Sequence, residues 1–521
     1  MKTRLAVSLI VMLLCAAAAA AAAAAQAETR EISIAELRSK IRGAWAGKCI
    51  GVAEGFPTEF RFQGKMVPAD KLPQWKPEMV REALRQDDLY VQMSFARVLD
   101  DKGLDATTAD FAAMHRDSKF SVWHASQASR RALRRGASPD ECGTPKWNAH
   151  GNDIAFQINA DFAGLMCPGL PQASNDLVRR AATVTCWGDG QYGGMFVAGM
   201  YAAAFFETDV RKVVEAGLAC VPPESDYAKS ISDVLAWSRD EQDWTSVWRR
   251  VNEKWDNQDR CPYGALEPLN IDAKINGAYL AIGLLYGGDD FWRTVTIATS
   301  CGQDSDCNPS TAAGIWAAMR GYNAIPPQYT DGIPAIAREK FVYTDYTFDS
   351  IVESSVNRAI AMIEKTGSRR DGDKLIIAVQ SPKPTQAPQY QIGKPVERIS
   401  CEDPRWTWAG EWTRFESAKS GVEKLASAKG SQATIEFEGT GALICGPYVG
   451  AGGAADVYLD GRLDRTIDVW PDENRRFAME NLWHRFDLPA GKHTLRLVVR
   501  GERFRESTGS EIRIHDVIVY R

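Results

Sequence analysis

The hydrophobic pattern of this chain changes its period once, and that change predicts two domains of different class. Apolar side chains recur at helical spacing through about residues 33–365, as the segment from Ile34 to Trp45 illustrates. After about residue 399 they alternate with polar ones, as in residues 434–438. We therefore expect a multidomain protein, with a mainly α domain followed by a C-terminal β-sandwich.

The first residues have the pattern of an export signal rather than of a folded element. Lys2 and Arg4 precede a short apolar run, and an alanine tract ends in Ala25-Gln26-Ala27. Because the apolar run is shorter than the roughly 20 residues that span a bilayer, we expect cleavage after Ala27. The mature protein would then be secreted or periplasmic, without membrane attachment. The alternative is a retained membrane anchor.

The remaining boundaries follow from the change of pattern. We predict a signal peptide at 1–27, a catalytic domain at 28–365, a linker at 366–395 and a β-sandwich accessory domain at 396–521. Pro382, Pro384 and Pro388 in the linker suit a semi-rigid spacer. Asp460-Gly461 predicts a hairpin turn within the sandwich.

Charge and cysteine content limit the partners. The formal net charge of −5 gives no electrostatic reason to expect a nucleic acid. Of 11 cysteines, Cys15 leaves with the signal, and an exported chain permits disulfides among the rest. Cys301 and Cys307 are near enough in sequence to bridge. The oligomeric state is not indicated.

Two clusters of carboxylates are placed where a structural role explains them poorly. Asp88, in Gln86-Asp87-Asp88, falls on the apolar face of an expected helix, where a carboxylate loses its hydration unless a cation or donors replace the water. The alternative is a partly exposed helix edge.

The second cluster is a turn that contains Asp304 and Asp306 before Asn308-Pro309. Asn308 suits an N-cap and Pro309 the first helical position. A capping loop would explain those two residues, but it would not require both aspartates. Two carboxylates at this spacing can converge on one hard cation.

Two weaker patterns supply candidate substrate-binding residues. A glycine-rich turn before an apolar helix contains Asp189, Gly190, Tyr192 and Gly193, without the spacing or lysine of a phosphate-binding loop. It could equally be a flexible turn that lets helices approach closely. Asp153 and Asp161, with Gln157 between them, have the spacing of one helical face, which could line a cleft or face water.

In this order the motifs resemble those of the ADP-ribosylglycohydrolase family. The resemblance covers about residues 34–365 and is carried by Gly51 with Pro57-Thr58-Glu59-Phe60, by Gln86-Asp87-Asp88-Leu89, and by Gly302-Gln303-Asp304-Ser305-Asp306-Cys307-Asn308. It implies a nearly all-helical catalytic domain with two magnesium ions, although Ca²⁺ or Mn²⁺ would also suit such ligands. The implied metal ligands are Gln86, Asp87, Asp88, Asp304 and Asp306.

The resemblance also implies a mechanism. Glu59, Asp88 and Asp304 would be catalytic, with a carboxylate acting as general base toward a water molecule that the metal site activates. Gln86 and Cys307 replace threonines of the family, and a thiol suits magnesium poorly. The family's histidine of the middle motif is replaced near Cys186-Trp187. These departures suggest a substrate other than ADP-ribose.

We therefore predict a secreted, metal-dependent hydrolase of an N- or O-glycosidic bond in a glycan or ADP-ribosyl-like substrate. The C-terminal region resembles galactose-binding-like sandwiches, in which Trp406, Trp408 and Trp412 would either stack on sugars or pack in the core. The alternatives are a non-catalytic glycan-binding protein and a true ADP-ribosyl-protein hydrolase. None of the histidines receives a role.

Overall fold

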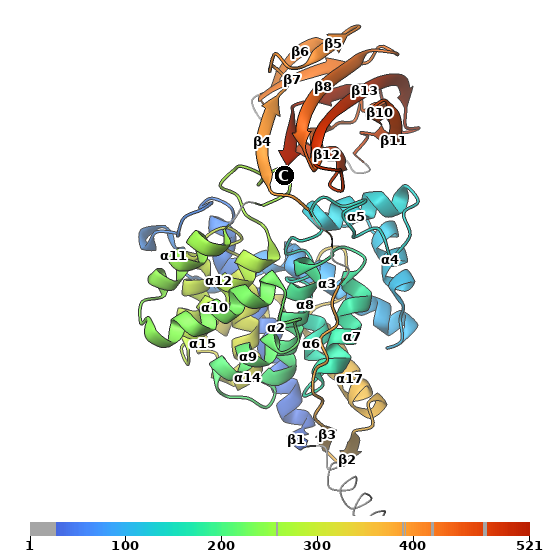
Figure 1. The fold of residues 1–521 in the computed structure, drawn as a ribbon. Helices are drawn as coiled ribbons and strands as arrows, with labels where there is room; N and C mark the ends of the chain where they lie inside the picture. Colours follow the sequence, from blue (N-terminus) through green and yellow to red (C-terminus); the bar gives the residue numbers. More distant parts are fainter. Residues whose placement is uncertain (1–27, 257–258, 388–389, 391, 418–420, 472–476) are drawn as a thin grey trace, which may run out of the picture.

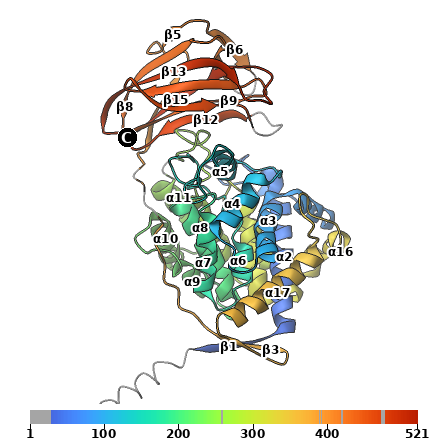
Figure 2. The same ribbon diagram turned by 90° about the vertical axis from the view of Figure 1, so that its right-hand side faces the viewer.

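The structure, a computed structural model, describes residues 28–521 except 257–258, 388–389, 391, 418–420 and 472–476. The predicted signal peptide lies outside the described residues. Within the described part of the chain, no helix combines the length and apolar character needed to cross a membrane. A helical body carries a β domain at one end, beside α5, and a small sheet at the other (Figures 1 and 2). This confirms the predicted fold class.

The helical body contains both long and short helices. They are α2 (Ile34–Gly55), η1 (Phe56–Thr58), η2 (Ala69–Lys71), η3 (Pro77–Arg85), α3 (Asp87–Lys102), α4 (Thr108–Asp117), α5 (His124–Arg134), α6 (Asp161–Leu165), α7 (Pro171–Ala182), α8 (Asp189–Ala204), α9 (Val210–Leu218), α10 (Asp226–Asp240), α11 (Trp244–Trp255), α12 (Ala273–Gly287), α13 (Phe291–Ser300), α14 (Cys307–Arg320), η4 (Tyr322–Ala324), α15 (Pro327–Thr330), α16 (Ile333–Ile336) and α17 (Phe348–Lys365).

Close packing of α2 against α14 forms the centre of this body. Gly47 and Gly51 make it possible, because a Cβ atom would lie 2.3 Å from the carbonyl oxygen of Ala313 at the first and of Pro309 at the second. At its start, α2 is capped by the Ser33 hydroxyl, which accepts a hydrogen bond of 3.0 Å from the backbone N–H of Glu36.

The first part of the predicted linker is sheet. Strands β2 (Arg369–Asp371) and β3 (Lys374–Ala378) form an antiparallel hairpin, and β3 also pairs with β1 (Thr29–Ser33) in the order β1-β3-β2. The chain thus returns to the start of the helical body before it runs to the β domain. Residues 369–378 belong structurally to that body.

The β domain consists of antiparallel strands in three sheets. The strands are β4 (Pro395–Ser400), β5 (Thr407–Ala409), β6 (Thr413–Ser417), β7 (Gly421–Ala426), β8 (Gln432–Gly439), β9 (Gly441–Tyr448), β10 (Gly453–Leu459), β11 (Arg462–Asp468), β12 (Phe477–Arg485), β13 (Gly491–Arg503), β14 (Ile512–Ile514) and β15 (Asp516–Tyr520). The sheet orders are β11-β10-β13-β8-β5, β12-β9-β15-β4 and β14-β7-β6.

Alternating residues of these strands build one apolar core between the sheets. Leu495, Leu497 and Val499 on β13 are each 1% exposed and belong to it, as the alternation predicts. Asp460 and Gly461 connect β10 to β11 with φ of 49° and 79°, which confirms the predicted hairpin turn.

Several local expectations are wrong. The helix expected through Asp88 is broken at Gln86, between η3 and α3. The glycine-rich segment is the first part of α8 itself, and residues 150–159 are turns rather than a helical face. α14 begins at Cys307 with Asp306 as its N-cap, two residues before the expected position.

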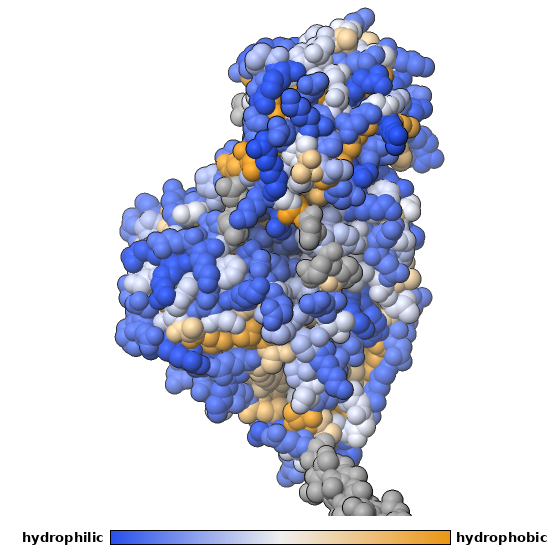
Figure 3. All heavy atoms as spheres, in the orientation of Figure 1, coloured by the Kyte–Doolittle hydropathy of each residue, from blue (hydrophilic) through white to orange (hydrophobic). Residues whose placement is uncertain are grey.

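The cysteines do not form the bridges that export would permit. All ten described cysteines, Cys301 and Cys307 among them, are free and buried. The surface is mainly hydrophilic on the face shown in Figure 3, where apolar side chains gather in small separate groups. Tertiary packing therefore stabilises both domains without covalent links in the described chain.

Candidate metal centre and its pocket

Three chain segments bring the predicted carboxylates together. Glu59 follows η1 at the end of α2, Asp88 lies in the first turn of α3, and Asp304 and Asp306 precede α14. Potential ligand atoms of Glu59, Asp304 and Asp306 all lie within 4.8 Å of one another. Asp88, Asp306 and Cys307 form a second group by the same measure. The two groups share Asp306, so they form one continuous acidic centre.

The buried oxygen atoms of this centre lack partners. Asp88, Asp304 and Asp306 are each at most 1% exposed. Both carboxylate oxygens of Asp304, Oδ1 of Asp306 and Oδ2 of Asp88 have no hydrogen bond. Leaving such groups unpaired is costly, which calls for a bound cation. Oxygen ligands of this kind suit Mg²⁺, Ca²⁺ or Mn²⁺, so the residues fit the metal site that the sequence motifs imply.

The electrostatics of the centre agree with this reading. Burial is the main cause that raises the pKa of Asp304 and Asp306 well above the ordinary value for aspartate, and neighbouring carboxylates add to it. Burial, followed by repulsion from Asp306, Asp87 and Asp88, raises the pKa of Glu59 to about 9. Burial and then Asp88 raise that of Asp87 to about 7. Negative charge is therefore crowded here beyond what the surrounding protein neutralises.

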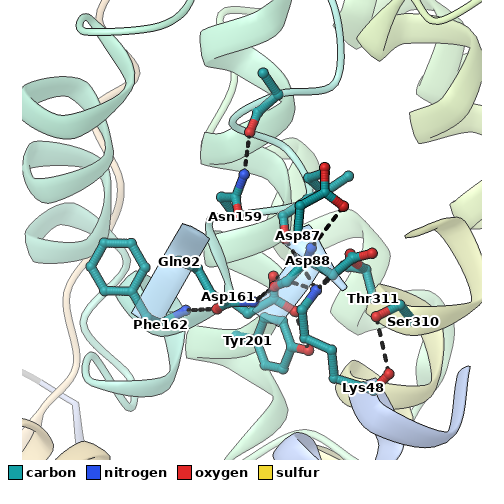
Figure 4. A network of polar contacts seen from close by, with 12 residues as sticks. Lys48, Asp87, Asp88, Gln92, Asn159, Asp161, Phe162, Tyr201, Ser310 and Thr311 are labelled. Atoms are coloured by element: carbon teal, nitrogen blue, oxygen red, sulfur yellow. Dashed lines mark hydrogen bonds and ion pairs between the residues drawn. The ribbon is translucent and has the colours of Figure 1, made fainter. Parts of the chain in front are cut away.

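A buried lysine on α2 lies beside this centre. Lys48 Nζ lies 3.3 Å from Oδ1 of Asp88 and 3.2 Å from Oδ2 of Asp161, and it donates to the carbonyl oxygen of Ile158 at 3.0 Å (Figure 4). Asp161 also accepts a hydrogen bond of 2.7 Å from the Tyr201 hydroxyl. The Lys48 side chain is 1% exposed, and its ammonium group also donates to the Thr311 hydroxyl at 3.5 Å. It neutralises one side of the acidic centre.

A cavity of about 480 Å³ opens onto the centre. Its lining combines acidic, apolar and aromatic side chains: Phe56, Glu59, Phe60, Glu82, Arg85, Gln86, Asp87, Val91, Val122, Trp123, His124, Ser126, Asp153, Ile154, Ala155, Ile158, Asn159, Ile271, Asp304 and Cys307. Phe56 is 40% exposed and Trp123 41% exposed, so both present ring surface at this cavity. The volume is within the range of small-ligand sites.

The predicted metal and catalytic residues lie at this cavity or at the centre beneath it. Gln86 lines the cavity, and its side-chain nitrogen donates to Glu82 at 3.1 Å, which leaves its carbonyl oxygen available to a ligand. Cys307 also lines it, and burial raises the pKa of its thiol well above the ordinary value, so it is protonated. Neither substitution blocks the oxygen ligands around it.

The predicted substrate-binding residues lie in different places, some at or under the cavity and the others in α8. Asp153 lines the cavity, but its oxygens accept hydrogen bonds from the backbone N–H groups of Ala125 in the first turn of α5 and of Ala155 in its own turn. Asp161 lies under the cavity in the Lys48 network. Both residues therefore have clear structural roles.

The four residues of α8 are not among the described residues that line the cavity. Gly190 and Gly193 allow close packing, since a Cβ atom would lie 2.5 Å from the carbonyl oxygen of Gly151 or from the Gln157 side chain. The Tyr192 hydroxyl accepts a hydrogen bond of 3.0 Å from the backbone of Ala387. Burial raises the pKa of Asp189 to about 6, while Lys274 opposes that shift.

Sequence reasoning missed Lys48, Trp123 and His124. Lys48 lies three residues after Trp45 and seven after Ile41, on the apolar face of α2, and a lysine at that position is a signal that could have found it. Trp123 and His124 belong to no pattern in the sequence. They reach the cavity only because α5 begins at its rim.

The mainly helical body contains a buried acidic centre, and the sequence comparison identifies the family to which it belongs. The model of the ADP-ribosylglycohydrolase family matches residues 33–359, so this chain belongs to that family. Membership suggests a hydrolase of glycosidic-type bonds, and such enzymes typically carry a binuclear metal site. No curated protein matches the sequence.

Solved structures are similar to portions of this chain. A structure described as an ADP-ribosylglycohydrolase-related protein complex is 16% identical, with a TM-score of 0.40, over 62% of this chain and 98% of its own. A family 35 carbohydrate binding module from Clostridium thermocellum is 15% identical, with a TM-score of 0.19, over 24% of this chain and 99% of its own. A CBM36-1 domain of a xylanase from the hindgut metagenome of Trinervitermes trinervoides is 13% identical, with a TM-score of 0.17, over 23% and 94%.

Proposed function

We propose that this protein is an exported, metal-dependent glycoside hydrolase that acts on an N- or O-glycosidic bond of a glycan. The observation that carries the proposal is the set of unpartnered, buried carboxylate oxygens of Asp304, Asp306 and Asp88 beside an open cavity of about 480 Å³. The leader supports export to the periplasm or beyond.

The metal ligands in this proposal are Asp87, Asp88, Asp304 and Asp306, with the amide oxygen of Gln86 in support. Two Mg²⁺ ions would suit the hard oxygen donors, and Ca²⁺ or Mn²⁺ could take their place. When bound, such ions supply Lewis acidity that polarises oxygen atoms of the substrate and of water.

Glu59 is the general base in this proposal. It lines the cavity, it is only partly exposed, and its carboxylate lies beside Asp304 and Asp306. Cations that offset the neighbouring carboxylates would lower its pKa from about 9, and from that position the ionised Glu59 could then accept the proton of a water molecule that attacks the anomeric carbon. Asp88 and Asp304 hold the site around that water rather than exchanging protons themselves.

The cavity wall favours a sugar over a pyrophosphate-containing substrate. Phe56 and Trp123 offer exposed rings on which the apolar face of a sugar can stack. Arg85 carries the one guanidinium group among the described lining residues, and this group forms a 2.5 Å ion pair with Glu82. A pyrophosphate would need cationic side chains to bind it, and the guanidinium group in this lining is already paired with a carboxylate.

The β domain is an accessory carbohydrate-binding module in this proposal. Trp406 is 7% exposed and packs in the core, whereas Trp408 and Trp412 are only partly buried against that core. Trp406 and Trp408 stack with their ring centroids 4.9 Å apart. Only the two partly buried rings retain surface for a sugar.

Calorimetric titration of the mature protein with Mg²⁺, followed by hydrolysis assays on a panel of glycosides and ADP-ribosylated peptides, tests the proposal. Asp304→Asn should weaken Mg²⁺ binding and abolish turnover without loss of helical circular dichroism. Asp176→Asn, at an aspartate 54% exposed on α7, is the matched control and should change neither. Equal Mg²⁺ affinity in Asp304→Asn and wild type would contradict the site. Binding of glycans without turnover would favour a degenerate enzyme instead.

A further inference from the structure

Two histidines and a cysteine meet where the β domain rests on the helical body. His124 is the first residue of α5, His150 lies in the turns before α6, and Cys261 lies in the loop before α12. Potential ligand atoms of the three residues all lie within 4.8 Å of one another. This group is distinct from the acidic centre, because it shares no residue with it.

Burial leaves ring nitrogens of this group without partners. His150 is 0% exposed and Cys261 is 1% exposed. Nδ1 of His124 and Nδ1 of His150 are both buried and have no hydrogen bond. A buried imidazole nitrogen without a partner costs free energy unless a ligand completes it. His124 also has a positive φ of 45°, which is an uncommon conformation for histidine.

A carboxylate from the β domain fixes one of these rings. His150 Nε2 lies 2.9 Å from Oε1 of Glu480 on β12. The carboxylate of Glu480 can only accept, so Nε2 of His150 donates and the other ring nitrogen, Nδ1, keeps its lone pair when the imidazole is neutral. A histidine whose far N–H is held by a carboxylate is the usual arrangement behind a bound metal.

We propose that His124, His150 and Cys261 bind a thiophilic first-row cation, foremost Zn²⁺, at the junction of the two domains. Two imidazole nitrogens and one thiolate suit Zn²⁺ and disfavour Mg²⁺, which prefers oxygen. Glu480 is a positioning residue, because it reaches the cation only through His150. The cation would thereby couple the β domain to the catalytic body.

One of the three residues, His124, lies at the cavity of the acidic centre. His124 lines the same cavity as Glu59 and Asp304, together with Trp123 and Asp153. Three protein ligands beside a cavity match the pattern of zinc sites that keep one position for water or substrate. The site thus borders the proposed substrate pocket through His124, and it does not depend on the proposed hydrolytic chemistry.

Cobalt substitution is the sharpest test, because Co²⁺ reports a bound thiolate by a charge-transfer band in the near ultraviolet. Metal-free mature protein should bind one equivalent of Co²⁺ with this band, and Zn²⁺ should remove it. Cys261→Ser should abolish the band, whereas Cys220→Ser, at another buried cysteine, should retain it. Asp304→Asn should also retain it, because the acidic centre is separate.

Glu480→Gln isolates the positioning role. It should weaken Co²⁺ and Zn²⁺ about 10–100-fold while the charge-transfer band keeps its shape, because the thiolate remains. Absence of a thiolate band in wild-type protein would overturn the proposal without any variant. Retention of the band in Cys261→Ser would overturn the ligand assignment and would leave the three residues as a packed cluster beside Tyr263, whose ring centroid lies 5.6 Å from that of His124.

Discussion

Replacing Lys48, whose ammonium group is buried, should lower the free energy of unfolding more than most single substitutions do. In Lys48→Met the hydrophobic stem is preserved, but Asp88 and Asp161 lose the cation that lies 3.3 Å and 3.2 Å from their oxygens. Removing one partner of a buried ion pair costs about 3–5 kcal/mol. Since domains are typically stable by about 5–15 kcal/mol, this is a large share of the free energy of unfolding.

Urea unfolding of the mature chain, followed by helical circular dichroism, measures this cost in the body that contains Lys48. Lys40→Met is a matched control on the same helix, because Lys40 Nζ donates at 2.8 Å to the carbonyl oxygen of Phe205 and its nearby acid, Glu36, is exposed. That control should cost about 1 kcal/mol.

A double-mutant cycle then tests the cause. Combining Lys48→Met with Asp161→Asn should cost less than the sum of the two single changes, by about 0.5–3 kcal/mol, because the second change removes one of the uncompensated charges. A loss below about 1 kcal/mol for Lys48→Met, or strict additivity in the cycle, would refute the reasoning.

Three further changes probe packing, pH dependence and catalysis. Gly51→Ala should destabilise the helical body by about 1–3 kcal/mol in urea titrations, because its Cβ atom would lie 2.3 Å from the carbonyl oxygen of Pro309; unchanged stability would show that α2 and α14 can separate at little cost. Burial, with help from Arg130, lowers the pKa of His115 from 6.5 to about 3, so the fold prefers the neutral ring. Its contribution to stability is present above pH 6.5 and is lost as the pH falls toward 3, by about 1.4 kcal/mol per unit, and His115→Gln should flatten that slope. Glu59→Gln should lower turnover about 10²–10⁴-fold while Mg²⁺ still raises the melting temperature, and full activity would exclude Glu59 as the base.

The division into a helical and a β domain could be predicted because it depends on local periodicity. The 3.6-residue and two-residue patterns survive in the sequence regardless of how the elements dock. The segment 150–159 shows the limit of that argument. Asp153, Gln157 and Asp161 have helical spacing, but backbone N–H groups of Ala125 and Ala155 bind Asp153 and hold the chain in turns. A contact with the first turn of α5, distant in sequence, helps to decide the conformation.

The carboxylates of the site could be predicted in part for a similar reason. Asp88 was conspicuous because a charge on an apolar face demands compensation, and that reasoning holds although η3 and α3 are separate helices. The group that compensates the charge of Asp88 could not be predicted from the neighbouring sequence. Lys48 is 40 residues away on α2, and the His150–Glu480 pair joins residues 330 positions apart. Residues this far apart in the sequence leave no local pattern that would show that their side chains are in contact.

The charges at the centre indicate how its two halves differ. Lys48 already occupies one oxygen of Asp88, and Asp88 Oδ2 remains unpartnered. At the other half, no ammonium group of the described residues pairs with Glu59, Asp304 or Asp306, and repulsion between these carboxylates adds to burial in raising their pKa values. A cation at this half gains attraction from three carboxylates without competing with Lys48. A cation beside Asp88 shares that carboxylate with the ammonium group, so the two metal positions should differ in affinity even though Asp306 belongs to both.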